Sequence, residues 1–194
     1  MMGAAIRELF GESVHAKEVF LAECAGALEG AIDVLTEALT GGHKVLLFGN
    51  GGSAADAQHI ASELVGRLTR ERRPLPAIAL TTDTSALTAI ANDYGYDQIF
   101  ARQVRALGAA GDVAIAISTS GNSPNVLRAV EACREMGLHV IGLTGGDGGA
   151  LARMADASLR VSASTRSMRI QETHILIGHV ICEMVDRRLF GDPS

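Results

Sequence analysis

Aromatic residues are scarce in this chain of 194 residues, which has no tryptophan, two tyrosines and five phenylalanines. Cysteine is scarce too. Cys24, Cys133 and Cys182 are far apart and form no CxxC pair, which argues against a disulfide framework and against a thiolate metal site. Proline occurs only four times and 47% of the residues are hydrophobic, so long disordered tracts are not expected.

The chain also has no cluster of positive charge and no long apolar run. The net charge is −5 and Lys and Arg form no block, so we expect no binding to nucleic acid or to an anionic membrane. No uninterrupted apolar run reaches the ~18 residues that a membrane-spanning helix needs. The chain begins with Arg7, Glu8, Glu12 and Lys17 where a secretion signal would be apolar, and this predicts a cytoplasmic protein.

Small aliphatic residues and 22 glycines are abundant instead, as suits a parallel sheet packed between helices. Short apolar runs bounded by turn residues predict five strands, at 44–48, 77–80, 113–117, 139–143 and 157–161. Helical patterns occupy the intervening and following residues, at 53–69, 85–107 with a break near Gly95, 124–136, 148–154 and 166–189.

This alternation of strands and helices predicts an α/β fold, a doubly wound five-stranded parallel sheet. No linker or change of composition divides the chain. Residues 1–194 are therefore expected to form a single domain, with the sheet core and the C-terminal helix in residues 43–190.

The first 42 residues lack strand-like runs and show helical spacing in two stripes. The stripes consist of Ile6, Leu9, Phe10, Val14, Val19 and Phe20, and of Leu28, Ile32, Leu35 and Leu39. The second stripe ends at Gly41 and Gly42. We therefore predict a pair of extra N-terminal helices over residues 1–42, which cover one sheet edge and are candidates for packing against another subunit.

Two strand–loop–helix units resemble each other. The first loop, Gly49–Ser53, is rich in glycine, and the second, Ser118–Ser123, is rich in hydroxyl groups. Backbone N–H groups and the positive end of a helix meet at such loops, and hydroxyls add neutral donors. Helix capping by Ser53 and Ser123 is the alternative for either loop alone. Two such loops at one sheet end favour a phosphate or sugar phosphate, and the lack of GxxxxGK[ST] and GxGxxG argues against a nucleoside triphosphate or NAD.

Four polar residues on two predicted helices could surround a divalent ion, and zinc best fits these donors. His59 and Glu63 stand at i and i+4 on helix 53–69, so their side chains emerge on one face. Gln171 and His179 stand at i and i+8 on helix 166–189, on nearly the same side. The four meet only if helix 166–189 folds back over the first loop.

Simpler interpretations exist for each of these residues. His59 and Glu63 alone make an ordinary solvated ion pair. His179 lies in an apolar stretch and alone reads as a hydrogen-bonded, partly buried histidine, and Gln171 as an ordinary polar residue. His174 lies on another face of its helix and is assigned a structural role.

Five stretches, taken in order, carry a resemblance to a known family. They are GNGGSAADAQHIASELVGR (49–67), LTAIANDYGYD (87–97), ISTSGNSPNV (117–126), LTGGDGG (143–149) and RIQETHILIGHVIC (169–182). They closely resemble the phosphoheptose isomerases, which are single-domain sugar isomerase (SIS) proteins. The resemblance implies a flavodoxin-like SIS fold and a homotetramer with zinc sites at its subunit interfaces. It also implies conversion of sedoheptulose 7-phosphate to D-glycero-D-manno-heptose 7-phosphate, the first step toward ADP- or GDP-heptose.

Carried over position by position, the family's metal ligands fall on His59, Glu63, Gln171 and His179, with one Zn²⁺ per subunit. Its phosphate and sugar contacts fall on Asn50, Gly51, Gly52, Ser53, Glu63, Arg67, Asn92, Asp93, Ser118, Thr119, Ser120, Ser123 and Gln171. One departure is Met168, which stands where some members have an Asp with a proposed catalytic role. Any ring opening assigned to that Asp must be done here by another group or by water.

Aldose–ketose isomerisation moves a proton between neighbouring carbons through an enediolate, which requires a carboxylate base and an acid for the oxygen proton. Following the family's assignment, Glu63 is the expected base and His179 the expected acid. A metal could polarise the carbonyl and stabilise the enediolate. An ion bound by both residues lowers their basicity, so the two roles could be successive.

The alternative function is a non-catalytic SIS tetramer that binds the replication initiator protein. Such relatives share stretches like those at 86–93 and 103–108, but they lack the carboxylate and the second histidine. Glu63 and His179 therefore favour the enzyme. Arabinose 5-phosphate isomerases are a third candidate, but these usually carry a trailing regulatory domain for which a chain ending at Ser194 has no room.

Overall fold

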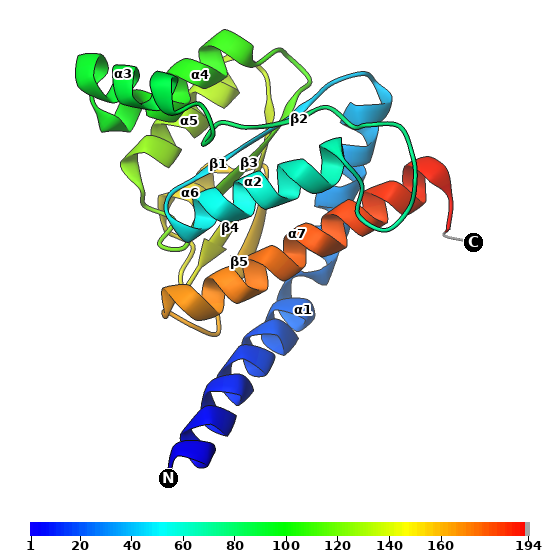
Figure 1. The fold of residues 1–194 in the computed structure, drawn as a ribbon, viewed down its shortest axis with the longest axis vertical. Helices are drawn as coiled ribbons and strands as arrows, with labels where there is room; N and C mark the ends of the chain where they lie inside the picture. Colours follow the sequence, from blue (N-terminus) through cyan, green and yellow to red (C-terminus); the bar gives the residue numbers. More distant parts are fainter. Residues whose placement is uncertain (193–194) are drawn as a thin grey trace.

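A computed structural model describes residues 1–192, whose fold is drawn in Figure 1. Pro193 and Ser194, at the end of the predicted domain, lie outside the described residues. The described strands are β1 (Val45–Gly49), β2 (Ala77–Ala79), β3 (Val113–Ser118), β4 (His139–Gly145) and β5 (Ala157–Val161). The helices are α1 (Met2–Thr40), α2 (Gly52–Val65), α3 (Thr84–Tyr94), η1 (Tyr96–Gln98), α4 (Ile99–Leu107), α5 (Pro124–Glu135), α6 (Gly149–Met154) and α7 (Ser167–Phe190).

The strands form a parallel sheet in the order β2-β1-β3-β4-β5, with Val45 of β1 aligned to Ala77 of β2 and to Val113 of β3. This is the flavodoxin-like order, so the predicted α/β fold class is confirmed. The predicted strands agree with the observed ones to within two residues at each end. The break near Gly95 is also observed, because α3 ends at Tyr94 and η1 begins at Tyr96.

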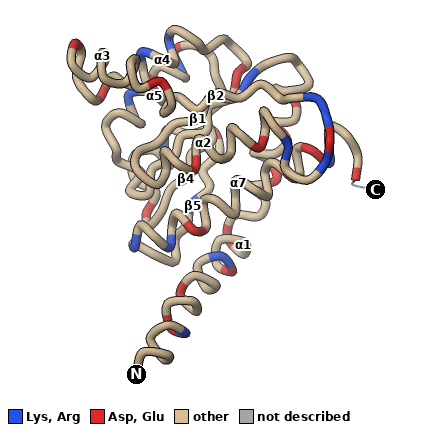
Figure 2. Tube along the Cα trace, viewed as in Figure 1, with Lys and Arg blue, Asp and Glu red and all other residues tan. Residues whose placement is uncertain are grey.

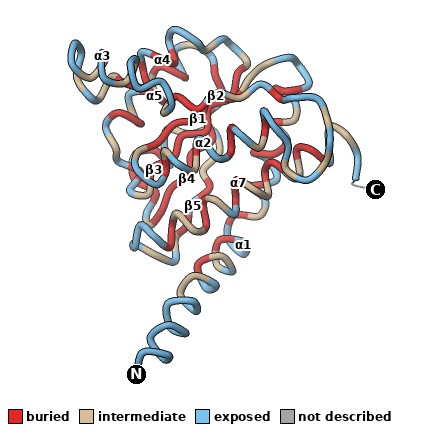
Figure 3. The backbone as a smooth tube through the Cα atoms, viewed as in Figure 1, coloured by how far each residue is buried: buried red, intermediate tan, exposed pale blue. Residues whose placement is uncertain are grey.

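Both faces of the sheet are covered by helices, so alternate side chains of a central strand enter two different cores. Val45 and Leu47 of β1 join the core that α1, α2 and α7 cover. Leu46 and Phe48 join the core that α3, α4, α5 and α6 cover. Figure 3 shows the strands as the buried centre of the molecule. This layering explains why the strands read as continuous apolar runs rather than as alternating patterns.

The prediction of an N-terminal helical pair is wrong, because α1 is one helix of 39 residues. Its core-facing side runs through Ala16, Phe20, Cys24 and Leu28, all of which are buried. These residues follow one another at i+4 and join the two predicted stripes into one. The break was inferred from the large apolar residues alone, whereas Ala16 and Cys24 continue the stripe with small ones.

The N-terminal part of α1 projects beyond the sheet and is exposed (Figures 1 and 3). Ile6, Leu9, Phe10 and Val14 are between 40% and 73% exposed, although their spacing is that of a core-facing stripe. Exposed apolar residues that gather on one helix face are typical of an interaction surface. The subunit contact expected for this segment remains a prediction.

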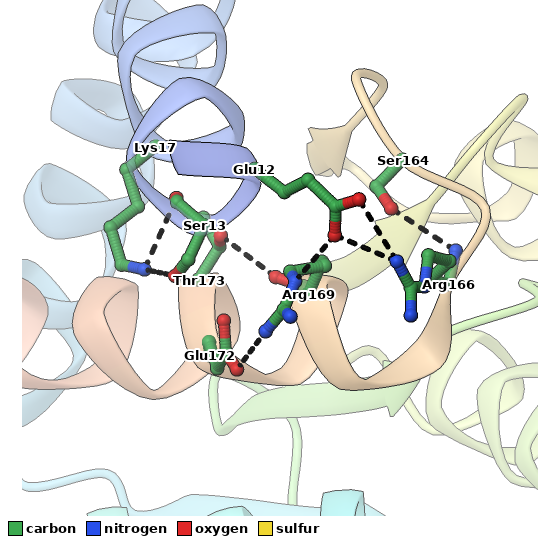
Figure 4. A network of polar contacts seen from close by, with 8 residues as sticks. All are labelled: Glu12, Ser13, Lys17, Ser164, Arg166, Arg169, Glu172 and Thr173. Carbon is green, nitrogen blue, oxygen red and sulfur yellow. Dashed lines mark hydrogen bonds and ion pairs between the residues drawn. The ribbon is translucent and has the colours of Figure 1, made fainter. Parts of the chain in front are cut away.

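A polar network ties the start of α7 to α1, as Figure 4 shows. Glu12 of α1 accepts hydrogen bonds from Arg166 at 2.7 Å and from Arg169 at 3.1 Å. Arg169 also pairs with Glu172 in the next turn, and its side chain is only 9% exposed. Arg169 therefore holds the first turns of α7 against α1.

Within the described part of the chain, no helix combines the length and the apolarity needed to cross a bilayer. Cys24, Cys133 and Cys182 are free and buried.

Candidate active site

Helix α7 packs against α2, and the contact brings three predicted site residues together. The Nε2 atoms of His59 and His179 lie 3.0 Å apart, and His59 Nε2 lies 3.4 Å from Glu63 Oε1. The side chains of His59 and Glu63 are 48% and 17% exposed, so the cluster is open to a ligand on one side. The fold-back of α7 that the sequence prediction required is therefore present.

Two glycines let the helices approach this closely. A Cβ atom on Gly178 would lie 2.6 Å from Cδ1 and Cγ1 of Ile60, and one on Gly52 would lie 2.5 Å from Nε2 of Gln171. Carbon atoms in van der Waals contact are normally ~3.5–4.0 Å apart, so a side chain at position 178 would push the helices away from each other. Gly178 immediately precedes His179 and faces the residue after His59, so it sets the distance between the two imidazoles.

The donors of this cluster fit a divalent ion. One ligand atom from each of His59, Glu63 and His179 lies within 4.8 Å of the others. Two ligands bound at ~2.0–2.1 Å to a tetrahedral ion lie ~3.4 Å apart, close to the observed separation of the two imidazole nitrogens. The observed 3.0 Å is also an ordinary hydrogen-bond length between two neutral imidazoles, one of which donates and the other accepts. The arrangement can therefore hold a metal ion or transfer a proton.

Gln171, the fourth predicted ligand, lies at the other end of the contact between α2 and α7. Its amide packs against the backbone of Gly52, in the first turn of α2. This places Gln171 beside the first loop, and its role as a ligand remains a prediction.

Cys182 also lies between α2 and α7, with its Sγ atom 4.0 Å from the carbonyl oxygen of Ile60. Burial raises the pKa of this thiol to about 12, and the nearby charges of Glu63 and Asp186 add to the effect. Cys182 therefore stays protonated at neutral pH and is neither a thiolate ligand nor a nucleophile.

The two hydroxyl-bearing loops lie at the carboxyl ends of β1 and β3, which pair with each other. In the second loop, Ser118 Oγ lies 3.0 Å from Ser123 Oγ and 3.5 Å from Ser120 Oγ. Ser123 is the N-cap of α5 but makes no side-chain cap hydrogen bond, and the N-cap of α2 is Gly51. The capping alternative is therefore wrong for both serines, and this cluster of hydroxyls needs another explanation.

A hollow of about 400 Å³ opens beside the second loop. Thr119 and Ser120 line it together with Gly146, Asp147 and Thr165. The last three were not among the predicted site residues. Gly146 and Asp147 follow the end of β4, and Thr165 follows the end of β5. Their places after the carboxyl ends of two parallel strands are the signal that would have found them.

Asn50 of the first loop and Asn125 of α5 exchange two side-chain hydrogen bonds, of 2.9 and 2.8 Å. The Tyr96 hydroxyl donates to the same oxygen of Asn50 at 3.3 Å. Asn125 is buried. The pair of hydrogen bonds between Asn50 and Asn125 therefore ties the first loop to the start of α5, directly after the second loop. Sequence reasoning missed Asn125, which resembles an ordinary first-turn residue after Pro124.

Three other residues predicted to contact the substrate lie elsewhere in the structure. Asn92 donates to Asp93 at 2.8 Å on α3, on the opposite side of the sheet from α2 and α7 (Figure 1). Arg67 follows the end of α2 and pairs with Glu71 at 2.8 Å. The contacts of these three residues with a substrate remain predictions.

His174 has the structural role assigned from the sequence. It is fully buried, and its Nε2 atom lies 3.0 Å from the carbonyl oxygen of Thr144 at the end of β4. Burial lowers the pKa of His174 to about 4, and the hydrogen bond to Thr144 offsets only part of this effect. His174 is therefore neutral and helps to hold α7 against the sheet.

Comparisons with known proteins agree on one family. A model of the SIS domain matches residues 10–145. The phosphoheptose isomerase of Rhodospirillum rubrum is 56% identical over 87% of this chain and 89% of its own length. That of Aquifex aeolicus is 54% identical over 93% of this chain and 94% of its own length. The structure of phosphoheptose isomerase from Neisseria gonorrhoeae superposes with a TM-score of 0.90 at 48% identity, covering 96% of this chain and 99% of the other.

Proposed function

Because the chain belongs to the phosphoheptose isomerase family of SIS-domain proteins, we propose that it converts sedoheptulose 7-phosphate to D-glycero-D-manno-heptose 7-phosphate. The observation that carries this function is the meeting of Glu63 and His179 from two helices distant in the sequence. The names of the relatives reported above lend no support to the alternative, a non-catalytic partner of the replication initiator protein.

Glu63 acts as the base. Its carboxylate takes a proton from C1 of the ketose, the electrons of that C–H bond form a C1–C2 double bond, and the carbonyl electrons move to the oxygen on C2. His179 carries a proton from the oxygen on C1 to the oxygen on C2, and Glu63 returns its proton to C2. One proton is removed from carbon and one is returned, so the product is the aldose isomer.

His59, Glu63, His179 and Gln171 hold a divalent ion, for which we propose zinc at one per subunit. One ligand atom from each of the first three residues lies within 4.8 Å of the other two, which supports this proposal. When bound, the ion supplies Lewis-acid stabilisation of negative charge on the substrate oxygens. Zinc accepts both nitrogen and oxygen ligands of this kind.

The phosphate binds at the two loops. Ser53, Ser118, Thr119, Ser120 and Ser123 supply hydroxyl donors, and Gly51 and Gly52 leave the backbone N–H groups of the first loop accessible. No helix-capping hydrogen bond occupies the Ser123 hydroxyl, which supports this assignment. Binding the phosphate away from the reacting carbons orients them against Glu63.

We further propose a homotetramer in the cytoplasm. The exposed stripe Ile6, Leu9, Phe10 and Val14 gives the subunits an apolar surface to bury. Asn92, Asp93 and Arg67 would then complete a site across a subunit interface.

The test is direct. Purified protein is incubated with sedoheptulose 7-phosphate, and the aldose product is measured by NMR. We expect turnover by the wild type and none by Glu63→Gln. A wild type that forms no product but captures the replication initiator protein would replace this function with the alternative.

A further inference from the structure

The loop between α2 and β2, at residues 66–76, contains four arginines, and Figure 2 shows it as a positively charged segment. One of the four is unlike the others. The side chain of Arg72 is only 2% exposed and pairs with Asp186 of α7, which is 3% exposed. Arg73 next to it is exposed and lies over the ring of Phe190, 5.8 Å from its centroid.

The guanidinium of Arg72 holds the end of α2. Nη2 donates to the carbonyl oxygen of Glu63 at 2.7 Å, and Nη1 donates to those of Leu64 and Gly66 at 2.8 Å each. The last carbonyls of a helix have no partner within the helix and carry partial negative charge, so a cation is favourable there. The first of these carbonyls belongs to the residue that carries the proposed base.

The same guanidinium reaches α7. Its Nε atom donates to Asp186 Oδ1 at 2.9 Å. Asp186 stands about two helical turns after His179, on nearly the same face of α7. Arg72 therefore connects the backbone of Glu63 to the helix of His179 through hydrogen bonds of fixed direction.

We infer that the Arg72–Asp186 pair is a positioning device for the reaction, which sets Glu63 relative to His179. This inference rests on the proposed isomerase function. Gly178 and Ile60 fix the distance between the helices at the level of the imidazoles, and the Arg72 fork fixes the end of α2, where Glu63 lies. Together they hold the backbone of Glu63 in place relative to α7.

Stability alone is a poor explanation for this pair. Taking two charges out of water costs several kcal/mol per ion, and apolar replacements of similar volume are often neutral or stabilising. Asp186 Oδ2 is buried and has no hydrogen-bond partner among the described residues, which adds to the cost. The planar fork of arginine is instead suited to holding several acceptors at fixed angles.

The test uses the double variant Arg72→Met/Asp186→Leu, which removes both charges together and puts apolar side chains in their place. Arg73→Met is the matched control, because it removes a neighbouring arginine that does not hold Glu63. We expect the double variant to remain folded, with kcat lowered by about tenfold or more and KM changed by less than about twofold, because the phosphate loops are untouched. Zn²⁺ affinity of metal-stripped protein, measured by calorimetry, should fall as well.

Arg72→Lys provides a second test of the positioning role, and this test does not require the double variant to fold. Lysine keeps the positive charge but lacks the planar guanidinium that donates to several acceptors at once, so kcat should again fall while KM is kept. Folded variants with wild-type kcat and wild-type Zn²⁺ affinity would overturn the positioning role. Absence of turnover in the wild type would instead contradict the isomerase function, and the Zn²⁺ affinities would still decide the role of Arg72.

Discussion

Replacing Gly178 with alanine perturbs the site without touching any of its polar atoms. The new Cβ atom would lie 2.6 Å from two atoms of Ile60, a side chain that is 1% exposed and packed on all sides. Restoring an ordinary carbon–carbon contact requires a shift of about 1 Å between α7 and α2. Overpacking of this kind costs about 1–3 kcal/mol of unfolding free energy.

The effect on catalysis should be larger than the effect on stability. A shift of about 1 Å would add to the 3.0 Å between the Nε2 atoms of His59 and His179. Misplacement by about 1 Å can cost about 100-fold in rate, so we expect kcat of Gly178→Ala to fall by about 10- to 100-fold. The assay is initial-rate formation of the aldose phosphate, with denaturant unfolding measured on the same samples.

Two further variants test whether the clash with Ile60 causes the fall in kcat. Gly30→Ala makes the same change in α1, where a Cβ atom would meet nothing within 4 Å, and should keep wild-type kcat. Ile60→Ala in the Gly178→Ala background removes the atoms that clash and should recover part of the lost activity. Wild-type kcat in Gly178→Ala would show that the contact between Gly178 and Ile60 does not set the distance between His59 and His179.

Other predictions follow from single residues. His59→Ala should lose the bound divalent ion, as read by elemental analysis, and full occupancy in that variant would place the ion elsewhere. Ser120→Ala should weaken substrate binding by about 0.5–1.5 kcal/mol, seen as a raised KM, and an unchanged KM would remove this hydroxyl from the phosphate site. The pKa of His174 is lowered from 6.5 to about 4 by burial, so the unfolded chain binds its proton first. Unfolding free energy should therefore fall by about 3 kcal/mol as the pH drops from 6.5 to 4, and His174→Gln should flatten that slope.

Much of the fold follows from local pattern. Buried parallel strands are short apolar runs in the sequence because helices cover both of their faces. This pattern predicted the ends of all five strands to within two residues. The length of α1 did not follow, because its continuity depends on Ala16 and Cys24, which are too small to mark a stripe by themselves. Large apolar residues outline a helix face, whereas small ones decide how closely it packs.

The site was predictable in its residue types and only partly in its geometry. The i, i+4 spacing placed His59 and Glu63 on one face, but their meeting with His179 depends on the contact between Gly178 and Ile60. Arg72 reads in the sequence as one of several loop arginines. Its burial depends on where α7 crosses the end of α2, a long-range property that no local pattern records.

The proposed reaction requires Glu63 to exchange a proton with a carbon of the sugar phosphate. This exchange is measured by incubating sedoheptulose 7-phosphate in D₂O with wild type and with Glu63→Gln, and detecting deuterium at the reacting carbons by NMR. We expect deuterium incorporation by the wild type and its loss in Glu63→Gln, with the fold of the variant unchanged. Incorporation by Glu63→Gln at the wild-type rate would contradict the assignment of Glu63 as the base.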